Sequence, residues 1–330
     1  MREAVSRTDR IDLMTTLDTL RKARRVLLCT HVQPDGDAIG SLLGLNSLLT
    51  AMGKGTMMIC HDPVPENLHI LPGWEDILPP EAAENESFDL GCSLDASDYE
   101  RIGMAGVFFN TCPATLVIDH HASNTYFGQK NYVDSFVAAT GNLVYRLFQA
   151  AKVEIDEKTA LNLYAAVSTD TGNFSFGLMD EEFFMQMAGL MRARLDIAAA
   201  SRLLHLTRHP AFIRLLGRAL NSLAFYCGGK LSVMKLRAAD FDETGASREN
   251  GEGIVNHGLN ILGVEMCFLA TEEGDTTRFN LRAIKPYDVS IIALEFGGGG
   301  HLLAAGCTVQ MPLEQAAEMM RARMERALMP

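Results

Sequence analysis

One imidazole and two carboxylates lie within seven positions of each other near the start of the chain. They belong to His31, Asp35 and Asp37, and a proline and a glycine bend the chain between them. The segment follows a short apolar run, residues 25–30, and precedes a stretch with leucines at helical spacing. A turn between a buried strand and a helix is where α/β proteins usually bind ligands. The pattern therefore predicts part of a metal site.

Three ligands do not fill the coordination shell of a divalent ion, and later segments supply further candidates. One apolar run is followed by Asp95, and another is followed by Asp119, His120 and His121. Asp170 lies in a turn rich in small residues, after a predicted helix. Taken alone, the Asp-His-His segment could equally be a loop with a capping aspartate, and the Asp170 turn could simply end a helix. Together with the first motif, they are better explained as ligands.

The combined donor set contains imidazoles and carboxylates but no thiolate. Such a set suits Mn²⁺ or Mg²⁺, with Fe²⁺, Co²⁺ or Zn²⁺ as alternatives. A carboxylate shared between two ions would explain why so many acids gather, because without metal they would repel one another. Two ions roughly 3.5 to 4 Å apart generate a nucleophile at neutral pH and hold the oxygens of a phosphorus centre, which predicts phosphoester hydrolysis. The predicted set is His31, Asp35, Asp37, Asp95, His120 and Asp170.

Alternating strand and helix patterns in the first part of the chain predict a mostly parallel sheet covered on both faces. We expect this α/β domain to span residues 1–185 and to be followed by a helical connector at residues 186–220. A smaller α/β domain is expected at residues 221–330. Its predicted elements are strands at residues 220–225, 231–236, 265–270 and 277–283, and a helix at 289–296.

Length and composition narrow the class of protein. With 330 residues, the chain can form two domains with their own cores. No apolar run approaches the length of a membrane span and no signal-peptide core is present, so we expect a cytoplasmic protein without membrane association. Seven cysteines without a Cys-x-x-Cys pair favour neither a disulfide framework nor a thiolate zinc site. A net charge of −12 argues against binding to long nucleic acid, but not against a short anionic substrate.

Five motifs, in this order along the chain, resemble those of the DHH phosphoesterases. They are His-x-x-Pro-Asp-Gly-Asp at residues 31–37, the isolated Asp95, Asp119-His120-His121, Asp170-Thr-Gly, and the glycine run that ends in His301. The resemblance covers residues from about 20 to 325 and includes the C-terminal domain that accompanies many members. It implies a catalytic first domain, a second domain that recognises the far end of the substrate, and a cleft between them.

The resemblance also implies a role for each candidate. One ion would be held by His31, Asp35 and Asp95, and a second by Asp37, Asp95, His120 and Asp170. Asp95 would therefore bridge the two ions, which we expect to be Mn²⁺, with Mg²⁺ or Co²⁺ as alternatives. His121 would act on the reacting phosphate as a proton donor or charge stabiliser, and Asp119 would orient its neighbours.

Four consecutive glycines, Gly297 to Gly300, precede His301 in the second domain. Amides that no side chain blocks can bind phosphate oxygens, although a glycine run is also a common hinge or turn. The resemblance implies nucleotide recognition by Gly299, Gly300 and His301. It also implies that Arg282 binds phosphate or stacks on a base, although the serines that usually flank this arginine are replaced here by Asn280 and Ala283.

Within the family, a chain of this size resembles the NrnA-like subgroup of oligoribonucleases and pAp phosphatases. This resemblance implies hydrolysis of very short RNA, including linear dinucleotides, to mononucleotides, and dephosphorylation of pAp to AMP. It is also compatible with a homodimer. The alternatives are a single-strand exonuclease of longer substrates and a nucleotide-binding regulator without turnover. A manganese pyrophosphatase is disfavoured, because that group lacks the glycine-rich histidine motif.

Overall fold

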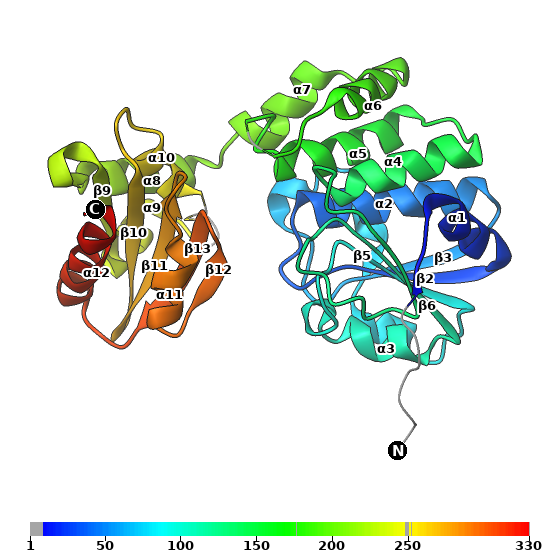
Figure 1. Ribbon diagram of the computed structural model, residues 1–330, viewed down its shortest axis with the longest axis horizontal. Coiled ribbons are helices and arrows are strands. Elements are labelled where there is room, and N and C mark those ends of the chain that lie inside the picture. The colour runs from blue at the N-terminus through cyan, green and yellow to red at the C-terminus, as the bar shows by residue number, and fades with distance from the viewer. Residues whose placement is uncertain (1–8, 176, 248–250, 252, 330) are drawn as a thin grey trace. The chain divides into compact units, whose positions relative to one another are not determined.

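The computed structural model describes residues 9–175, 177–247, 251 and 253–329. The chain forms two compact units that divide between Thr207 and Arg208 (Figure 1). The expected connector at residues 186–220 is shared between the units. Helices α6 (Glu181–Arg192) and α7 (Ile197–Ser201) pack in the first unit, whereas α8 (Pro210–Asn221) belongs to the second.

A mostly parallel sheet forms the centre of the first unit, as the alternating pattern predicts. Within the described residues its strands lie in the order β1-β7-β6-β5-β2-β3-β4, and all neighbouring pairs are parallel. The strands are β1 (Asp9–Arg10), β2 (Arg25–Cys29), β3 (Gly55–Ile59), β4 (Ile77–Leu78), β5 (Leu90–Leu94), β6 (Ala114–Asp119) and β7 (Lys130–Val133).

Helices cover both faces of this sheet (Figure 1). Val26 and Leu28 of β2 belong to one hydrophobic core, and Leu27 and Cys29 belong to the other, as the alternation of a strand requires. The smaller core includes Phe109 of α3. The larger core contains residues of α1, α2, α4 and α5, and also residues of α6 and α7. The bounds are α1 (Leu13–Lys22), α2 (Gly36–Ala51), α3 (Ala105–Thr111), α4 (Thr140–Ala151) and α5 (Glu157–Asp170).

The second unit contains a mixed sheet with strand order β12-β13-β11-β10-β9-β8 among the described residues. Strands β9 and β10 pair in parallel, and the other neighbours are antiparallel. Its strands are β8 (Ala224–Tyr226), β9 (Leu231–Leu236), β10 (Met266–Glu273), β11 (Thr276–Ala283), β12 (Gly299–His301) and β13 (Ala304–Val309). Its remaining helices are α9 (Ala238–Thr244), α10 (Ile254–Leu259), α11 (Val289–Glu295) and α12 (Leu313–Leu328).

Three local expectations need correction. The predicted strand at residues 220–225 is wrong for its first half, because α8 buries Phe212, Leu215 and Ala219 on one face and continues to Asn221. Asp170 is the last residue of α5 rather than part of a turn after it. The second half of the glycine run forms strand β12 rather than a loop.

In the part of the chain that the structure describes, no helix combines the length and the apolar character of a membrane span.

Candidate metal centre

The carboxyl ends of three neighbouring parallel strands, β6, β5 and β2, supply the middle of the site. Asp119 is the last residue of β6, Asp95 directly follows β5, and His31 follows β2 by two positions. Parallel strands end at the same edge of a sheet, so residues distant in sequence meet there. All three side chains are buried, with exposed fractions of 0%, 2% and 4%, respectively.

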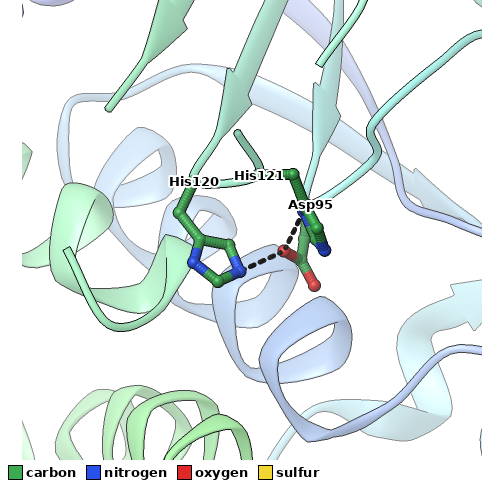
Figure 2. Close-up of side chains that lie close together, drawn as sticks. All are labelled: Asp95, His120 and His121. Carbon is green, nitrogen blue, oxygen red and sulfur yellow. Dashed lines mark ion pairs between the residues drawn. The ribbon is translucent and has the colours of Figure 1, made fainter. Parts of the chain in front are cut away.

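Asp95 lies among the imidazoles of the site, and its two carboxylate oxygens face different histidines. Oδ2 is 3.6 Å from Nε2 of His31. Oδ1 is 3.6 Å from Nε2 of His120 and 3.7 Å from Nδ1 of His121 (Figure 2). The backbone of Asp95 has a φ of 56°, a left-handed conformation that non-glycine residues rarely adopt and that clusters at functional sites. Asp95 thus has one oxygen on the side of His31 and the other on the side of His120 and His121.

The N-terminus of α2 brings two more carboxylates. Asp35 caps the helix, because its Oδ1 accepts the backbone N–H groups of Asp37 at 3.0 Å and Ala38 at 3.1 Å. The same oxygen is 3.8 Å from Nε2 of His31. Asp35 is exposed, whereas Asp37, two residues further along the chain, is fully buried. Asp35 therefore approaches the site from the solvent-exposed side, and Asp37 approaches it from the buried side.

His120 lies between the start of α2 and the end of α5. Its Nε2 is 3.3 Å from Oδ2 of Asp170 and 3.8 Å from Oδ2 of Asp37. Because α2 begins where α5 ends, these carboxylates converge on one imidazole. They form the second half of the site, which shares Asp95 with the first half.

Three overlapping groups of potential ligand atoms result, and within each group all atoms lie within 4.8 Å of one another. Among the described residues the groups are His31-Asp35-Asp95, Asp37-His120-Asp170 and Asp95-His120-His121. The six predicted ligands are thus brought together. Their donors are carboxylate oxygens and imidazole nitrogens, with no thiolate, and such a set fits Mn²⁺ or Mg²⁺.

The electrostatics of the carboxylates also fit bound cations. Burial, together with the charges of Asp95 and Asp170, raises the pKa of Asp37 well above its usual range. Burial likewise raises the pKa of Asp170 to about 6. Carboxylates in such surroundings disfavour their own ionised forms, and a divalent ion reverses this preference by supplying the missing positive charge.

His31 is oriented by its own backbone. Its Nδ1 lies 2.8 Å from the carbonyl oxygen of Val32, and the guanidinium of Arg101 is 3.2 Å from the same nitrogen. A ligating histidine commonly donates its second ring N–H to a carbonyl, which leaves Nε2 for the metal. Burial alone would lower the pKa of His31, but hydrogen bonds and charges from Asp35 and Asp95 outweigh it and raise the pKa to about 10.

His121 forms a separate chain of hydrogen bonds with Asp119. Nδ1 of His121 donates to Oδ1 of Asp119 at 2.7 Å, and Oδ2 of Asp119 accepts from the side-chain amide of Asn124 at 2.6 Å. Burial would lower the pKa of His121, but the hydrogen bond and charge of Asp119 outweigh it and raise the pKa to about 9. Asp119 therefore favours the protonated form of this imidazole, in which Nε2 also carries a proton.

The predicted substrate residues lie in the second unit, where Arg282 and His301 share one register position of the sheet. Ala304 of β13 pairs with Arg282 on one side and with His301 on the other. The Nε of Arg282 donates to Oδ1 of Asn256 at 3.1 Å, and its Nη1 donates to the carbonyl of Leu281 at 2.9 Å. The side chain of His301 lies outside the described part of the structure.

The two predicted glycines of this region serve the hairpin β12–β13. Gly299 pairs with Gly306, and Gly300 pairs with Ala305. Gly300 has a φ of 142°, and a Cβ atom there would lie 2.5 Å from Cα of Ala305. Nothing lies within 4 Å of a Cβ added at Gly299. The backbone thus requires glycine at position 300, whereas position 299 is open.

Sequence reasoning missed two residues that hold the site. The Asn124 amide anchors Asp119, and no motif separated this asparagine from an ordinary turn residue. Thr140, the first residue of α4 after the N-cap Ala139, is the other one. Its hydroxyl donates to Oδ1 of Asp95 at 2.9 Å, and its backbone N–H donates to Oδ2 of Asp37 at 2.6 Å.

Two family models match the chain. The DHH family, N-terminal domain, matches residues 25–167, and the DHHA1 domain matches residues 228–329. A bifunctional oligoribonuclease and PAP phosphatase NrnA from Thermus thermophilus is 32% identical over 297 residues, which are 89% of this chain and 87% of the relative. The two matched domains contain all of the predicted ligands except Asp170, which follows the first match by three residues.

Solved structures share the fold. An exopolyphosphatase-related protein from Bacteroides fragilis superposes with a TM-score of 0.89 at 26% identity, and the match covers 95% of each chain. RecJ from Thermus thermophilus in complex with Mn²⁺ has a TM-score of 0.53 at 13% identity, covering 95% of this chain and 54% of RecJ. From the two domain matches and the extent of the NrnA alignment, we conclude that this chain belongs to the DHH family, in its NrnA-like subgroup.

Proposed function

We propose that this chain is a metal-dependent phosphoesterase that hydrolyses very short RNA to mononucleotides and converts pAp to AMP. The observation that carries the proposal is the position of Asp95, whose Oδ2 faces His31 and whose Oδ1 faces His120. The name of the Thermus thermophilus relative, a bifunctional oligoribonuclease and PAP phosphatase, supports the same activity over nearly the whole chain.

Two divalent ions fit the donor set, with Mn²⁺ as the first candidate and Mg²⁺ or Co²⁺ as alternatives. When bound, such a pair lowers the pKa of water and offsets the charge of a phosphate undergoing in-line displacement. His31, Asp35 and Asp95 would hold the first ion. Asp37, His120 and Asp170 would hold the second, together with Asp95, whose Oδ1 lies 3.6 Å from Nε2 of His120.

His121 supplies the proton chemistry of the proposed reaction. Its Nδ1–H is bound to Asp119, so the ring cannot rotate without breaking a 2.7 Å hydrogen bond. The protonated Nε2 can then donate to a phosphate oxygen or to the departing oxygen of the ester. Asn124 holds Asp119 from the opposite side and so fixes the orientation of the pair.

The second unit is proposed to bind the nucleotide end of the substrate. Arg282 offers a planar guanidinium suited to phosphate or to stacking on a base, and Asn256 orients it through Nε. The neighbouring glycines and His301 complete the proposed recognition element. A net charge of −12 favours short substrates, because a long strand would gain little from the surface outside the site.

The test is hydrolysis of end-labelled RNAs ranging from dinucleotides to long single strands, with pAp and pyrophosphate as further substrates. Each reaction is run with Mn²⁺, with EDTA, and with Mn²⁺ restored after EDTA. We expect turnover of dinucleotides and of pAp that EDTA abolishes and Mn²⁺ restores.

Other outcomes would overturn the proposal in distinct ways. A preference for long strands would assign the chain to single-strand exonucleases. Turnover of pyrophosphate alone would assign it to pyrophosphatases. Binding of dinucleotides and Mn²⁺ without any turnover would make the chain a nucleotide-binding regulator.

A further inference from the structure

Thr140 occupies a fully buried position against the metal centre, although it offers no typical metal-ligand group. It is the first residue of α4, and it lies 45 positions from Asp95 and 103 positions from Asp37 in the chain. Its hydroxyl and its backbone N–H each donate to one of these two aspartates. A single residue therefore contacts carboxylates from both halves of the site.

The hydroxyl contact decides the orientation of the shared ligand. The Thr140 hydroxyl donates to Oδ1 of Asp95 at 2.9 Å, whereas the nearest histidine nitrogens lie 3.6 to 3.7 Å from the Asp95 carboxylate. Oδ1 faces His120, so the bond holds it towards the second half and leaves Oδ2 towards His31. Without the bond, rotation of the carboxylate would no longer be restrained on this side.

The Asp37 contact involves the start of α4. Ala139, the N-cap residue, has no side-chain acceptor for the first N–H groups of the helix. Asp37 takes this role, since its Oδ2 accepts from Thr140 N and its Oδ1 accepts from Gly141 N at 3.0 Å. A carboxylate at a helix N-terminus is stabilised by these donors and by the helix dipole.

A second set of hydrogen bonds holds Thr140 itself in place. The side-chain oxygen of Asn142 accepts the backbone N–H of Ala139 at 3.0 Å, and its amide donates to Gln186 of α6 at 2.7 Å. Asn142 and Gln186 are both buried. A group that orients a ligand acts best when its own geometry is fixed by packing and hydrogen bonds.

We infer that Thr140 is a positioning residue of the metal centre, which orients Asp95 and Asp37 for joint binding of two divalent ions. The inference rests on the proposed function only in assuming that the site binds metal. It does not depend on the identity of the substrate.

The test compares Thr140→Val with Thr140→Ser in the full-length protein. Valine keeps the shape and burial of the side chain but removes the donor, whereas serine keeps the donor. After removal of metal with EDTA, Mn²⁺ binding is measured by titration calorimetry. We expect Thr140→Val to lose about 10- to 100-fold in Mn²⁺ affinity, the usual effect of removing a supporting hydrogen bond, and Thr140→Ser to stay near wild type.

Thr277→Val is the matched control. Thr277 is also fully buried and also donates its hydroxyl to an oxygen, the carbonyl of Met311 at 2.8 Å, but it lies in the second unit. It should lose stability without losing Mn²⁺ affinity. Thermal unfolding of all metal-free variants separates a folding defect from a binding defect.

Wild-type Mn²⁺ affinity and stoichiometry in Thr140→Val would overturn the inference. An equal loss of affinity in Thr277→Val would also overturn it, because the effect would then follow general destabilisation. If the wild-type chain binds Mn²⁺ but cleaves none of the RNAs, the proposed function fails while the role of Thr140 can still be measured.

Discussion

At the scale of single residues, Asp95 is the position on which most of the proposed chemistry depends. Asp95→Asn preserves the shape of the side chain but removes its charge and replaces one carboxylate oxygen by an NH2 group, which cannot bind a cation. We expect hydrolysis of dinucleotides to fall by more than about 100-fold, beyond the usual effect of losing a supporting hydrogen bond. The measurement is the rate at saturating Mn²⁺, together with the metal content determined by elemental analysis.

Asp156→Asn is a suitable control for this change. Asp156 caps α5 at the end opposite Asp170, through a hydrogen bond from Thr159 N at 2.8 Å, and asparagine can also cap a helix. This variant should keep both metal and activity. Wild-type turnover by Asp95→Asn that EDTA still abolishes would instead disprove the shared-ligand assignment. Turnover that resists EDTA would point to a contaminating nuclease.

The sequence indicated that the proposed ligands would lie close together, because each follows, begins or ends a predicted strand or helix. The residues that hold the ligands could not be predicted in this way. Thr140 reaches Asp95 from 45 positions away, and Asn124 binds an oxygen of Asp119 that no local pattern marks. Such partners follow from tertiary packing, which a one-dimensional pattern of strands and helices does not contain.

At the scale of elements, the approach of α2 to α5 sets the distance between two sides of the site. Gly36, Gly40 and Gly44 lie four positions apart and therefore share one face of α2. A Cβ atom at Gly40 would lie 2.3 Å from the carbonyl oxygen of Asn162, a backbone atom of α5. Close contact of the two helices lets Asp37 and Asp170 reach the same imidazole.

Gly40→Ala should therefore affect both stability and metal binding. We expect a loss of about 1–3 kcal/mol in the free energy of unfolding, the usual cost of overpacking, because backbone of α5 must shift. Mn²⁺ affinity should fall with it, as measured by calorimetry on the folded protein.

Gly217→Ala in α8 is the control. Nothing lies within 4 Å of its added Cβ, so it should stabilise the helix by about 1 kcal/mol. Unchanged stability and affinity in Gly40→Ala would contradict this role.

The hairpin of β12 and β13 allows a second comparison between elements. Gly300→Ala places a Cβ against Ala305 in a conformation with positive φ, so we expect it to destabilise the hairpin by about 1–3 kcal/mol and to raise KM. Gly299→Ala meets no neighbour and should change stability little. Urea unfolding and KM for dinucleotides are the measurements. A rise in KM for Gly299→Ala at unchanged stability would show that this position faces the substrate, whereas equal stability of both variants would contradict the structural explanation.

The hairpin of β12 and β13 also contains a strand that the sequence pattern did not predict. Four glycines in a row have low strand propensity, so the pattern favoured a loop. Strand β12 forms because β13 pairs with it at Gly299, Gly300 and His301. Helices α2 and α5, by contrast, follow capping aspartates, Asp35 and Asp156, and contain apolar residues at helical spacing, which are signals that a sequence carries locally.

At the scale of the whole molecule, the two units have separate sheets and separate hydrophobic cores. Every proposed metal ligand, from His31 to Asp170, belongs to the first unit, which ends at Thr207. A ligand that binds only the folded state stabilises the unit that contains its site. Metal should therefore stabilise the two units unequally.

Calorimetric unfolding with and without Mn²⁺ tests this expectation. At about 100 times the dissociation constant, bound metal adds about 2.7 kcal/mol to the free energy of unfolding, which for a unit of this size corresponds to a rise in Tm of about 5–10 °C. One transition should shift by this amount after Mn²⁺ is added to EDTA-treated protein, and the other should stay in place. In Asp95→Asn the shift should largely disappear, which assigns the moving transition to the first unit. An equal shift of both transitions would instead mean that residues of the second unit take part in holding the metal, and that the ligand set in the first unit is incomplete.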